Sequence, residues 1–222
     1  MAKMKREVFL SGGTGYMGRA LTEKLLDRGH HVRVLTRPGS ESKVAGGAAV
    51  VRGNALEEAS FAGAVGGSDT YVHLTGVTHP APWKEREFRA IDQASLQASA
   101  RAACAANAGH FVYVSVAHPA PVMRAYLQVR RECEDFLSGL GLTCTILRPW
   151  YVLGPGHRWP AALKPVYAML ERIPSTRAGA LRLGLVTREQ MTTALAWAVE
   201  NPPDQTRILD VPAIRSAHLV QE

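Results

Sequence analysis

The chain has 222 residues, of which 46% are hydrophobic and 20% charged, and its 26 Lys and Arg exceed its 19 Asp and Glu by seven. This composition excludes a disordered chain, and the length suits one domain or one and a half at ~150 residues per domain. Three cysteines without paired spacing exclude a disulfide scaffold, so we expect a cytoplasmic protein. No apolar run approaches the ~18 residues of a membrane span, so no membrane contact is expected.

The positive balance raises the question of a nucleic-acid partner. Lys and Arg stand singly or in pairs among acids, as in the segment 83–89, and form no cluster. A solvated surface with a small excess of arginine accounts for this pattern, and cations that serve a small anionic ligand are a further interpretation. We therefore expect no nucleic-acid partner.

Short apolar runs alternate with helical patterns along most of the chain. The runs predict strands at 7–11, 31–36, 48–52, 70–74, 110–115 and 143–147. The first helix carries Met17 and Leu21 on one face and ends at Gly29, and further helices are predicted over about 85–107 and 122–140. Beyond residue 149 we expect a loop, a helix, a strand near 181–186, and a helix that Thr187 and Gln190 open as a capping box.

Strand–helix alternation with little period-2 polarity indicates a parallel sheet that helices cover on both faces. The right-handed crossover rule then favours a doubly wound α/β sheet, the Rossmann fold. We expect residues 1–149 to form the dinucleotide-binding domain and residues 150–222 to form a small cap on the substrate side of the same globule. The sequence leaves a monomer and a homodimer equally open.

The strongest motif is the glycine-rich segment 11–18, SGGTGYMG. It follows an apolar strand and opens an amphipathic helix, where glycines let the backbone approach a pyrophosphate and the helix N-terminus stabilises its charge. A glycine-rich turn without a ligand is the alternative. We predict a dinucleotide site whose residues here are Gly12, Gly13, Thr14, Gly15, Tyr16, Met17 and Gly18.

The end of the second predicted strand indicates which dinucleotide is bound. NAD-binding proteins of this type place an acid there to hold the ribose 2′-hydroxyl, whereas this chain has Thr36 and Arg37 and no acid before Glu41. A guanidinium attracts a 2′-phosphate that an acid would repel. NADP(H) is therefore favoured over NAD(H), and the alternative interpretation of Arg37 is a plain surface arginine at a turn.

These ordered motifs resemble those of the short-chain dehydrogenase/reductase superfamily, in its extended or atypical branch of epimerase-like and NmrA-like NAD(P)-binding proteins. The likeness covers most of the chain, through the glycine loop and the segments 51–56, 71–76, 113–115 and 147–149. It implies that Asn54, in place of an Asp, and Ala55 lie against the adenine. It also implies that Thr75 and Gly76 border the cofactor and that Pro149 lies beside the nicotinamide.

The catalytic pair of that family is Tyr-x-x-x-Lys, and its counterpart here is Tyr126 with Arg130. By the resemblance, Ser115 orients a substrate carbonyl and Tyr126 passes the proton. A tyrosine with a pKa of about 10 needs a nearby cation to exchange protons near neutrality, and Arg130 lies one helical turn away. A planar guanidinium is not a compact ammonium, and Tyr126 also fits the apolar stripe of an amphipathic helix.

The sequence thus predicts an NADP(H)-dependent oxidoreductase or epimerase-like enzyme that transfers hydride to or from a small carbonyl or alcohol. The alternative is a non-catalytic NADP(H)-binding redox sensor or regulatory protein, which the arginine in place of lysine and the short C-terminal part favour. The histidines show no metal-ligand spacing, so no metal is expected. His79, His118 and His157 fall in loops after predicted strands, where a small-molecule substrate would bind.

Overall fold

The structure, a computed structural model, describes residues 4–154 and 173–217. Its main sheet has seven strands, β1 (Glu7–Ser11), β2 (His31–Thr36), β3 (Ala49–Arg52), β4 (Thr70–His73), β5 (His110–Val114), β6 (Cys144–Leu147) and β9 (Arg207–Leu209). They lie in the order β3-β2-β1-β4-β5-β6-β9, and every neighbouring pair is parallel. The chain order reverses between β1 and β4, which is where doubly wound sheets bind ligands. The expected Rossmann fold is confirmed.

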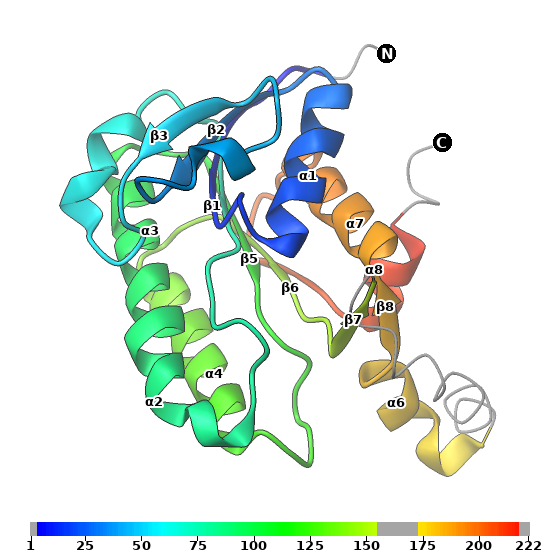
Figure 1. Cartoon of the computed structure of the whole chain (residues 1–222). Coiled ribbons are helices and arrows are strands. Elements are labelled where there is room, and N and C mark those ends of the chain that lie inside the picture. Colours follow the sequence, from blue (N-terminus) through cyan, green and yellow to red (C-terminus); the bar gives the residue numbers. More distant parts are fainter. Residues whose placement is uncertain (1–3, 155–172, 218–222) are drawn as a thin grey trace.

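Helices cover both faces of this sheet (Figure 1). One layer contains α1 (Tyr16–Asp27), α7 (Arg188–Glu200) and α8 (Val211–Ser216), and the other contains α2 (Glu85–Glu87), α3 (Ala94–Ala105) and α4 (Arg124–Gly139). Because side chains alternate along a strand, Val8 and Leu10 pack in the first layer while Phe9 packs in the second. Two separate apolar cores result, one on each face.

The six predicted strands are confirmed to within one or two residues. The helix predicted over 85–107 is divided, because a π-helical segment, η5 (Phe88–Gln93), lies between α2 and α3. The described residues also form four short 3₁₀ turns, η1 (Glu41–Lys43), η2 (Glu58–Ser60), η3 (Ala62–Ala64) and η4 (Pro82–Lys84). None of the helices among the described residues is long and apolar enough to cross a membrane.

The strand predicted near 181–186 is wrong in its first half. Helix α6 (Pro174–Arg182) ends there, and strand β8 (Leu185–Thr187) begins later and pairs with β7 (Tyr151–Leu153) in a second sheet. Leu181, Leu183 and Leu185 alternate with other residues in the way that is typical of a strand, but Leu181 belongs to the end of helix α6. The capping box that opens α7 is confirmed, since the Gln190 backbone N–H donates to Thr187 Oγ1 at 3.1 Å.

The residues that follow position 149 contribute to two parts of the fold. Helix α6 and the β7–β8 sheet lie beside the main sheet, toward its carboxyl edge (Figure 1). Strand β9 instead joins the main sheet next to β6, and α7 packs on α1. The predicted loop residue His157 lies outside the described residues.

Candidate functional site

The loop between β1 and α1 passes very close to the end of β4. Gly12 has a φ of +82°, and a Cβ at this position would lie 2.6 Å from the carbonyl carbon of Leu74. A Cβ on Gly18 would lie 2.2 Å from the carbonyl oxygen of Gly12. Only glycine satisfies both the backbone conformation and this close approach. The glycine pattern therefore has a geometric cause at this turn.

The N-terminus of α1 is not capped by any side chain. Its N-cap residue is Gly15, which supplies no side-chain hydrogen bond, and the first turn of the helix contains no acidic residue. The first backbone N–H groups of a helix lack partners within the helix and carry a partial positive charge. This end of α1 can therefore hold the phosphates of a dinucleotide.

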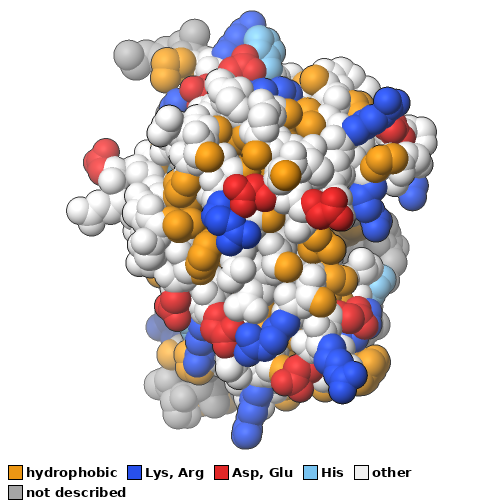
Figure 2. All heavy atoms as spheres, turned by 90° about the vertical axis from the view of Figure 1, so that its left-hand side faces the viewer, with side chains coloured by type: hydrophobic (Ala, Val, Ile, Leu, Met, Phe, Trp, Pro, Cys, Tyr) orange, Lys and Arg blue, Asp and Glu red, His pale blue; other side chains and the backbone are white. Residues whose placement is uncertain are grey.

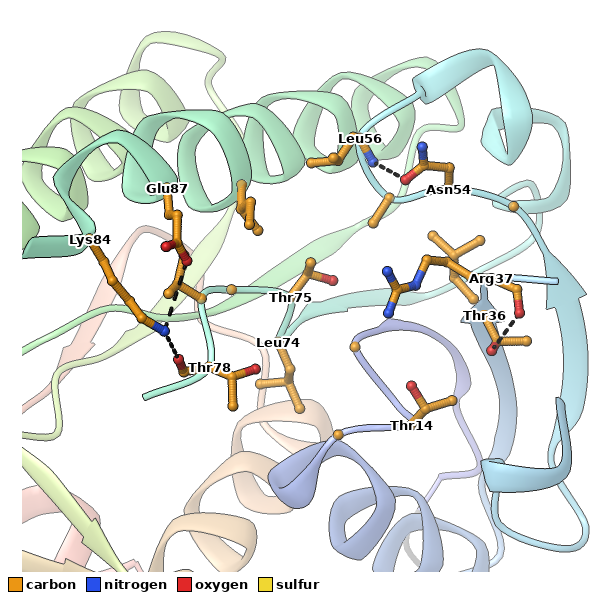
Figure 3. A pocket seen from close by; sticks show the side chains of 18 residues that line it. Thr14, Thr36, Arg37, Asn54, Leu56, Leu74, Thr75, Thr78, Lys84 and Glu87 are labelled. Carbon is orange, nitrogen blue, oxygen red and sulfur yellow. Dashed lines mark hydrogen bonds and ion pairs between the residues drawn. The ribbon is translucent and has the colours of Figure 1, made fainter. Parts of the chain in front are cut away.

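A cleft of about 490 Å³ opens between the carboxyl ends of β1, β2, β3 and β4 (Figure 3). Nine of the predicted cofactor-binding residues line it, namely Gly12, Thr14, Gly15, Thr36, Arg37, Asn54, Ala55, Thr75 and Gly76. The other five lie outside its lining, namely Gly13, Tyr16, Met17, Gly18 and Pro149. The tertiary structure thus gathers residues from four separate loops around one cavity.

Two polar groups of the cleft are available to a ligand. The guanidinium of Arg37 extends into the cavity (Figure 3) and forms no ion pair with any residue that the structure describes. The Thr75 hydroxyl is buried and has no hydrogen-bond partner among the described residues. Leaving such a group unsatisfied costs roughly 1–3 kcal/mol. A bound nucleotide that offered it an acceptor would remove this cost, so the cleft fits a phosphorylated nucleotide.

Asn54 shapes one wall of the cleft through its own loop. Its Oδ1 accepts a hydrogen bond from the Leu56 backbone N–H at 3.1 Å, and its Nδ2 donates to Glu57 Oε1 at 2.9 Å. Both ends of the amide therefore stabilise the turn after β3. A base bound in this region would therefore pack against a preformed loop, because the Asn54 amide already uses both its oxygen and its nitrogen within that loop.

Two charged lining residues, Lys84 and Glu87, were not predicted. Lys84 Nζ donates to the Thr78 carbonyl at 2.8 Å and lies 3.9 Å from Glu87 Oε2, which holds the loop after β4 in place (Figure 3). Nothing in the sequence marks them, because they are two charges among several in the segment 83–89. Only the path of the chain after β4 brings them to the cleft.

Arg130 is buried and held on three sides. It donates to the Tyr113 hydroxyl at 3.0 Å and to the Val114 carbonyl at 2.9 Å, and it forms an ion pair with Asp92. Asp92 is 1% exposed and also accepts a hydrogen bond from the Val77 N–H at 3.1 Å. The charge of Arg130 therefore already faces a carboxylate within the protein.

The structure brings Tyr126 and Arg130 together, as the Tyr-x-x-x-Arg spacing predicts. The guanidinium carbon of Arg130 lies 4.9 Å from the centre of the Tyr126 ring, and the Phe88 ring lies 5.0 Å from it on η5. Burial raises the pKa of Tyr126, Arg130 lowers it in part, and Asp92 raises it further. Tyr126 therefore keeps its proton near neutral pH. It is not among the residues that line the described cleft.

Ser115, at the end of β5, is bound to a residue that the prediction did not assign to the site. Its hydroxyl donates to Glu134 Oε1 at 2.5 Å, and Glu134 forms an ion pair with Arg148 after β6. His118 Nε2 lies 3.7 Å from the same carboxylate oxygen. To donate to a substrate carbonyl, the Ser115 hydroxyl would have to leave Glu134.

The surface over α2, α3 and α4 carries no block of one charge. Figure 2 shows Lys and Arg side by side with Asp and Glu on this face. Arg89 pairs with Glu132 and Arg101 pairs with Glu58, both at 2.7 Å. No group of three His, Cys, Asp or Glu residues within 4–154 and 173–217 could hold a metal ion.

The doubly wound sheet and the glycine-lined cleft at its switch point define a dinucleotide-binding protein of the Rossmann type. The chain matches the NAD(P)H-binding family model over residues 12–158, and it belongs to that family. The resemblance is thus confirmed for the NAD(P)H-binding family, and the fold is shared with a solved short-chain dehydrogenase/reductase superfamily protein from Agrobacterium tumefaciens.

Similar proteins include enzymes that bind nicotinamide cofactors. A ceramide reductase of Caulobacter vibrioides (strain NA1000 / CB15N) is 28% identical over 155 residues, which cover 67% of this chain and 47% of that protein. This chain thus spans about half the length of that relative. The Bordetella bronchiseptica enzyme WbmH in complex with NAD+ has a TM-score of 0.70 and 19% identity, covering 93% of this chain and 76% of its own. MoeE5 in complex with UDP-glucuronic acid and NAD has a TM-score of 0.71 and 18% identity, and the match covers 92% of this chain and 76% of the MoeE5 chain. These structures share the fold.

Proposed function

We propose that this protein is an NADP(H)-dependent oxidoreductase that reduces a carbonyl group of a small molecule. The observation that carries the cofactor preference is Arg37, whose guanidinium extends into the cleft after β2 and pairs with no acid of the described chain. A bidentate guanidinium matches the 2′-phosphate of NADP(H). The uncapped N-terminus of α1 matches the pyrophosphate.

The protonation state of Tyr126 favours reduction of a carbonyl over oxidation of an alcohol. When bound, NADPH supplies the hydride that reduces the carbonyl carbon. Because burial keeps Tyr126 protonated, its hydroxyl can donate a proton to the carbonyl oxygen as negative charge develops there. Arg130 lies against the ring and stabilises the phenolate that remains, with part of its charge offset by Asp92. We assign the proton donor to Tyr126, because the Ser115 proton is engaged by Glu134.

Binding titrations test the cofactor proposal. Arg37→Ser should weaken NADPH binding by roughly 10- to 100-fold, the value of a charge-assisted bidentate contact, and should leave NADH binding almost unchanged. Arg52→Ser is the matched control, since Arg52 ends the adjacent strand and pairs with Glu41 at 2.8 Å instead of lining the cleft. If the wild type binds NADH as tightly as NADPH, the preference assigned to Arg37 is wrong.

Turnover assays test the catalytic proposal. NADPH oxidation is followed with aldehydes, ketones and the ketone from which reduction would form a ceramide, the compound class in the name of the Caulobacter relative. Tyr126→Phe should lower kcat at least 100-fold, the order expected for loss of a general acid, with NADPH affinity retained. Equal turnover by Tyr126→Phe would show that another group donates the proton.

A second function, an NADP(H)-binding redox sensor or regulatory protein, is favoured by the contacts around the catalytic candidates. Asp92 neutralises Arg130, and Glu134 holds Ser115, so both groups already have partners. Tight NADPH binding without turnover of any compound, together with no effect of Tyr126→Phe, would support this second function.

A further inference from the structure

A second cavity, of about 490 Å³, lies at the carboxyl edge of the sheet beside β5, β6 and β9. We call it the arginine pocket. None of its lining residues lines the cofactor cleft. Its lining includes Ala117, His118, Arg148, Arg182, Ile208 and Asp210.

Each arginine of the pocket is fixed by part of its guanidinium. Arg182, on α6, donates through Nε to the Pro119 carbonyl at 3.0 Å, and its two terminal nitrogens have no partner among the described residues. Arg148 uses Nε and Nη2 on the carboxylate of Glu134. The Nη1 of Arg148 bonds to no other residue of the described chain. Both forks are therefore oriented before a ligand arrives, which lowers the entropy lost on binding.

The charges around the pocket leave one cation without a close counter-charge. Glu134 is matched by its ion pair with Arg148. Asp210 is exposed to solvent, and its Oδ1 accepts a hydrogen bond from Ala213 as the N-cap of α8. Arg182 is only half-exposed and forms no ion pair within the described residues. A partly buried guanidinium without a counter-charge forms stronger hydrogen bonds to an anion than to water.

His118 supplies a further polar group in the pocket wall. Its Nε2 is buried, lies 3.7 Å from Glu134 Oε1 and has no hydrogen-bond partner in the described chain. A ligand oxygen placed between this nitrogen and Arg182 would satisfy both. Ala117 and Ile208 add apolar surface, so the pocket also has room for the carbon skeleton that carries such an oxygen.

We propose that the arginine pocket is a second anion site, which binds a carboxylate or phosphate group independently of the nicotinamide cofactor. The group is held by Arg182 and Arg148, with His118 as an additional partner. Because the pocket and the cofactor cleft share no residue, a ligand can occupy both at once.

Calorimetric titration of NADPH-saturated protein tests this site, because the bound cofactor blocks the N-terminus of α1. Inorganic phosphate and acetate are titrated separately, and the tighter probe shows which kind of oxyanion the pocket prefers. Arg182→Ala should weaken that probe about tenfold or more. Arg177→Ala removes an exposed arginine of the same helix that does not line the pocket, and should leave the affinity unchanged.

A gain of affinity gives a test that misfolding cannot imitate. Asp210→Asn keeps a side-chain oxygen for the α8 cap and removes the negative charge, so it should tighten the same probe severalfold. Equal losses in Arg182→Ala and Arg177→Ala would indicate general surface attraction and overturn the proposal. An absence of saturable binding by both probes would overturn it as well. NADPH affinity is measured in parallel, so a failure here is distinct from a failure of the cofactor proposal.

Discussion

Replacing Asp92 with asparagine would leave the guanidinium of Arg130 without its counter-charge inside the α3–α4 layer. Asp92 is 1% exposed and Arg130 7% exposed, and Gly76 lies directly over the pair, since a Cβ there would be 3.0 Å from Asp92 Oδ1. Removing one partner of a buried pair costs about 3–5 kcal/mol. At roughly 2–4 °C per kcal/mol for a chain of this size, Tm should fall by about 6–20 °C.

Thermal and urea unfolding measure this loss. Glu132→Gln is the control, because Glu132 and its partner Arg89 are 32% and 48% exposed. Such an exposed ion pair contributes about 0–1 kcal/mol to the free energy of unfolding. The double variant Asp92→Leu with Arg130→Met should lose less than Asp92→Asn alone, because it leaves no buried charge. If Asp92→Asn costs no more than Glu132→Gln, the pair is not desolvated and the reasoning fails.

The same substitution tests the link from Asp92 to Tyr126. The carboxylate raises the pKa of Tyr126, whereas Arg130 lowers it. Asp92→Asn should therefore lower the pKa of Tyr126, which absorbance of tyrosinate reports when Tyr126→Phe serves as the blank. An unchanged or higher pKa would show that the Asp92 carboxylate does not act on this phenol.

Three further predictions concern the cofactor loop and stability. Gly12→Ala should weaken NADPH binding more than about tenfold, because the Cβ meets the Leu74 backbone at 2.6 Å, and unchanged affinity would refute the close-approach argument. His73 and His110 are buried with pKa values lowered to about 3 and about 4, chiefly by desolvation. Both stay neutral in the folded state and take up a proton on unfolding below about pH 6.5, so urea unfolding should show stability falling by about 2 kcal/mol per histidine from pH 6.5 to pH 5. A flat profile would contradict this. Thr187→Ala removes the α7 cap and should cost about 1 kcal/mol in the same unfolding assay, with the exposed loop residue Thr206, changed to Ala, as the control.

The fold and the glycine loop could be predicted because their signals are local. Strand-forming runs and the glycine pattern each lie within a few residues, and backbone sterics make them readable without tertiary contacts. Strand β9, in contrast, was missed, since Arg207–Leu209 is too short to show a period and becomes a strand only by pairing with β6. The strand predicted near 181 failed because alternating leucines also occur where α6 ends and β8 begins.

The partners of the catalytic candidates could not be predicted, because they are distant in sequence. Asp92 and Arg130 are 38 residues apart, and Ser115 and Glu134 are 19 residues apart. Charged residues of both signs are scattered along the chain, so no spacing selects one pairing over another. Lys84 and Arg182 could not be predicted as lining residues either. The path of the chain after β4 brings Lys84 to its cavity, and the packing of α6 brings Arg182 to the other.

The sequence by itself determined a doubly wound sheet, a glycine-rich turn between β1 and α1, and an arginine directly after β2 in place of an acid. These follow from local backbone preferences and side-chain periodicity, which act over one strand and one helix. Only the tertiary structure decided that Arg130 is neutralised by Asp92, that Ser115 is bound to Glu134, and that Arg182 and Arg148 share a pocket. Such pairings depend on which charges burial brings together, and burial is a property of the whole packed chain.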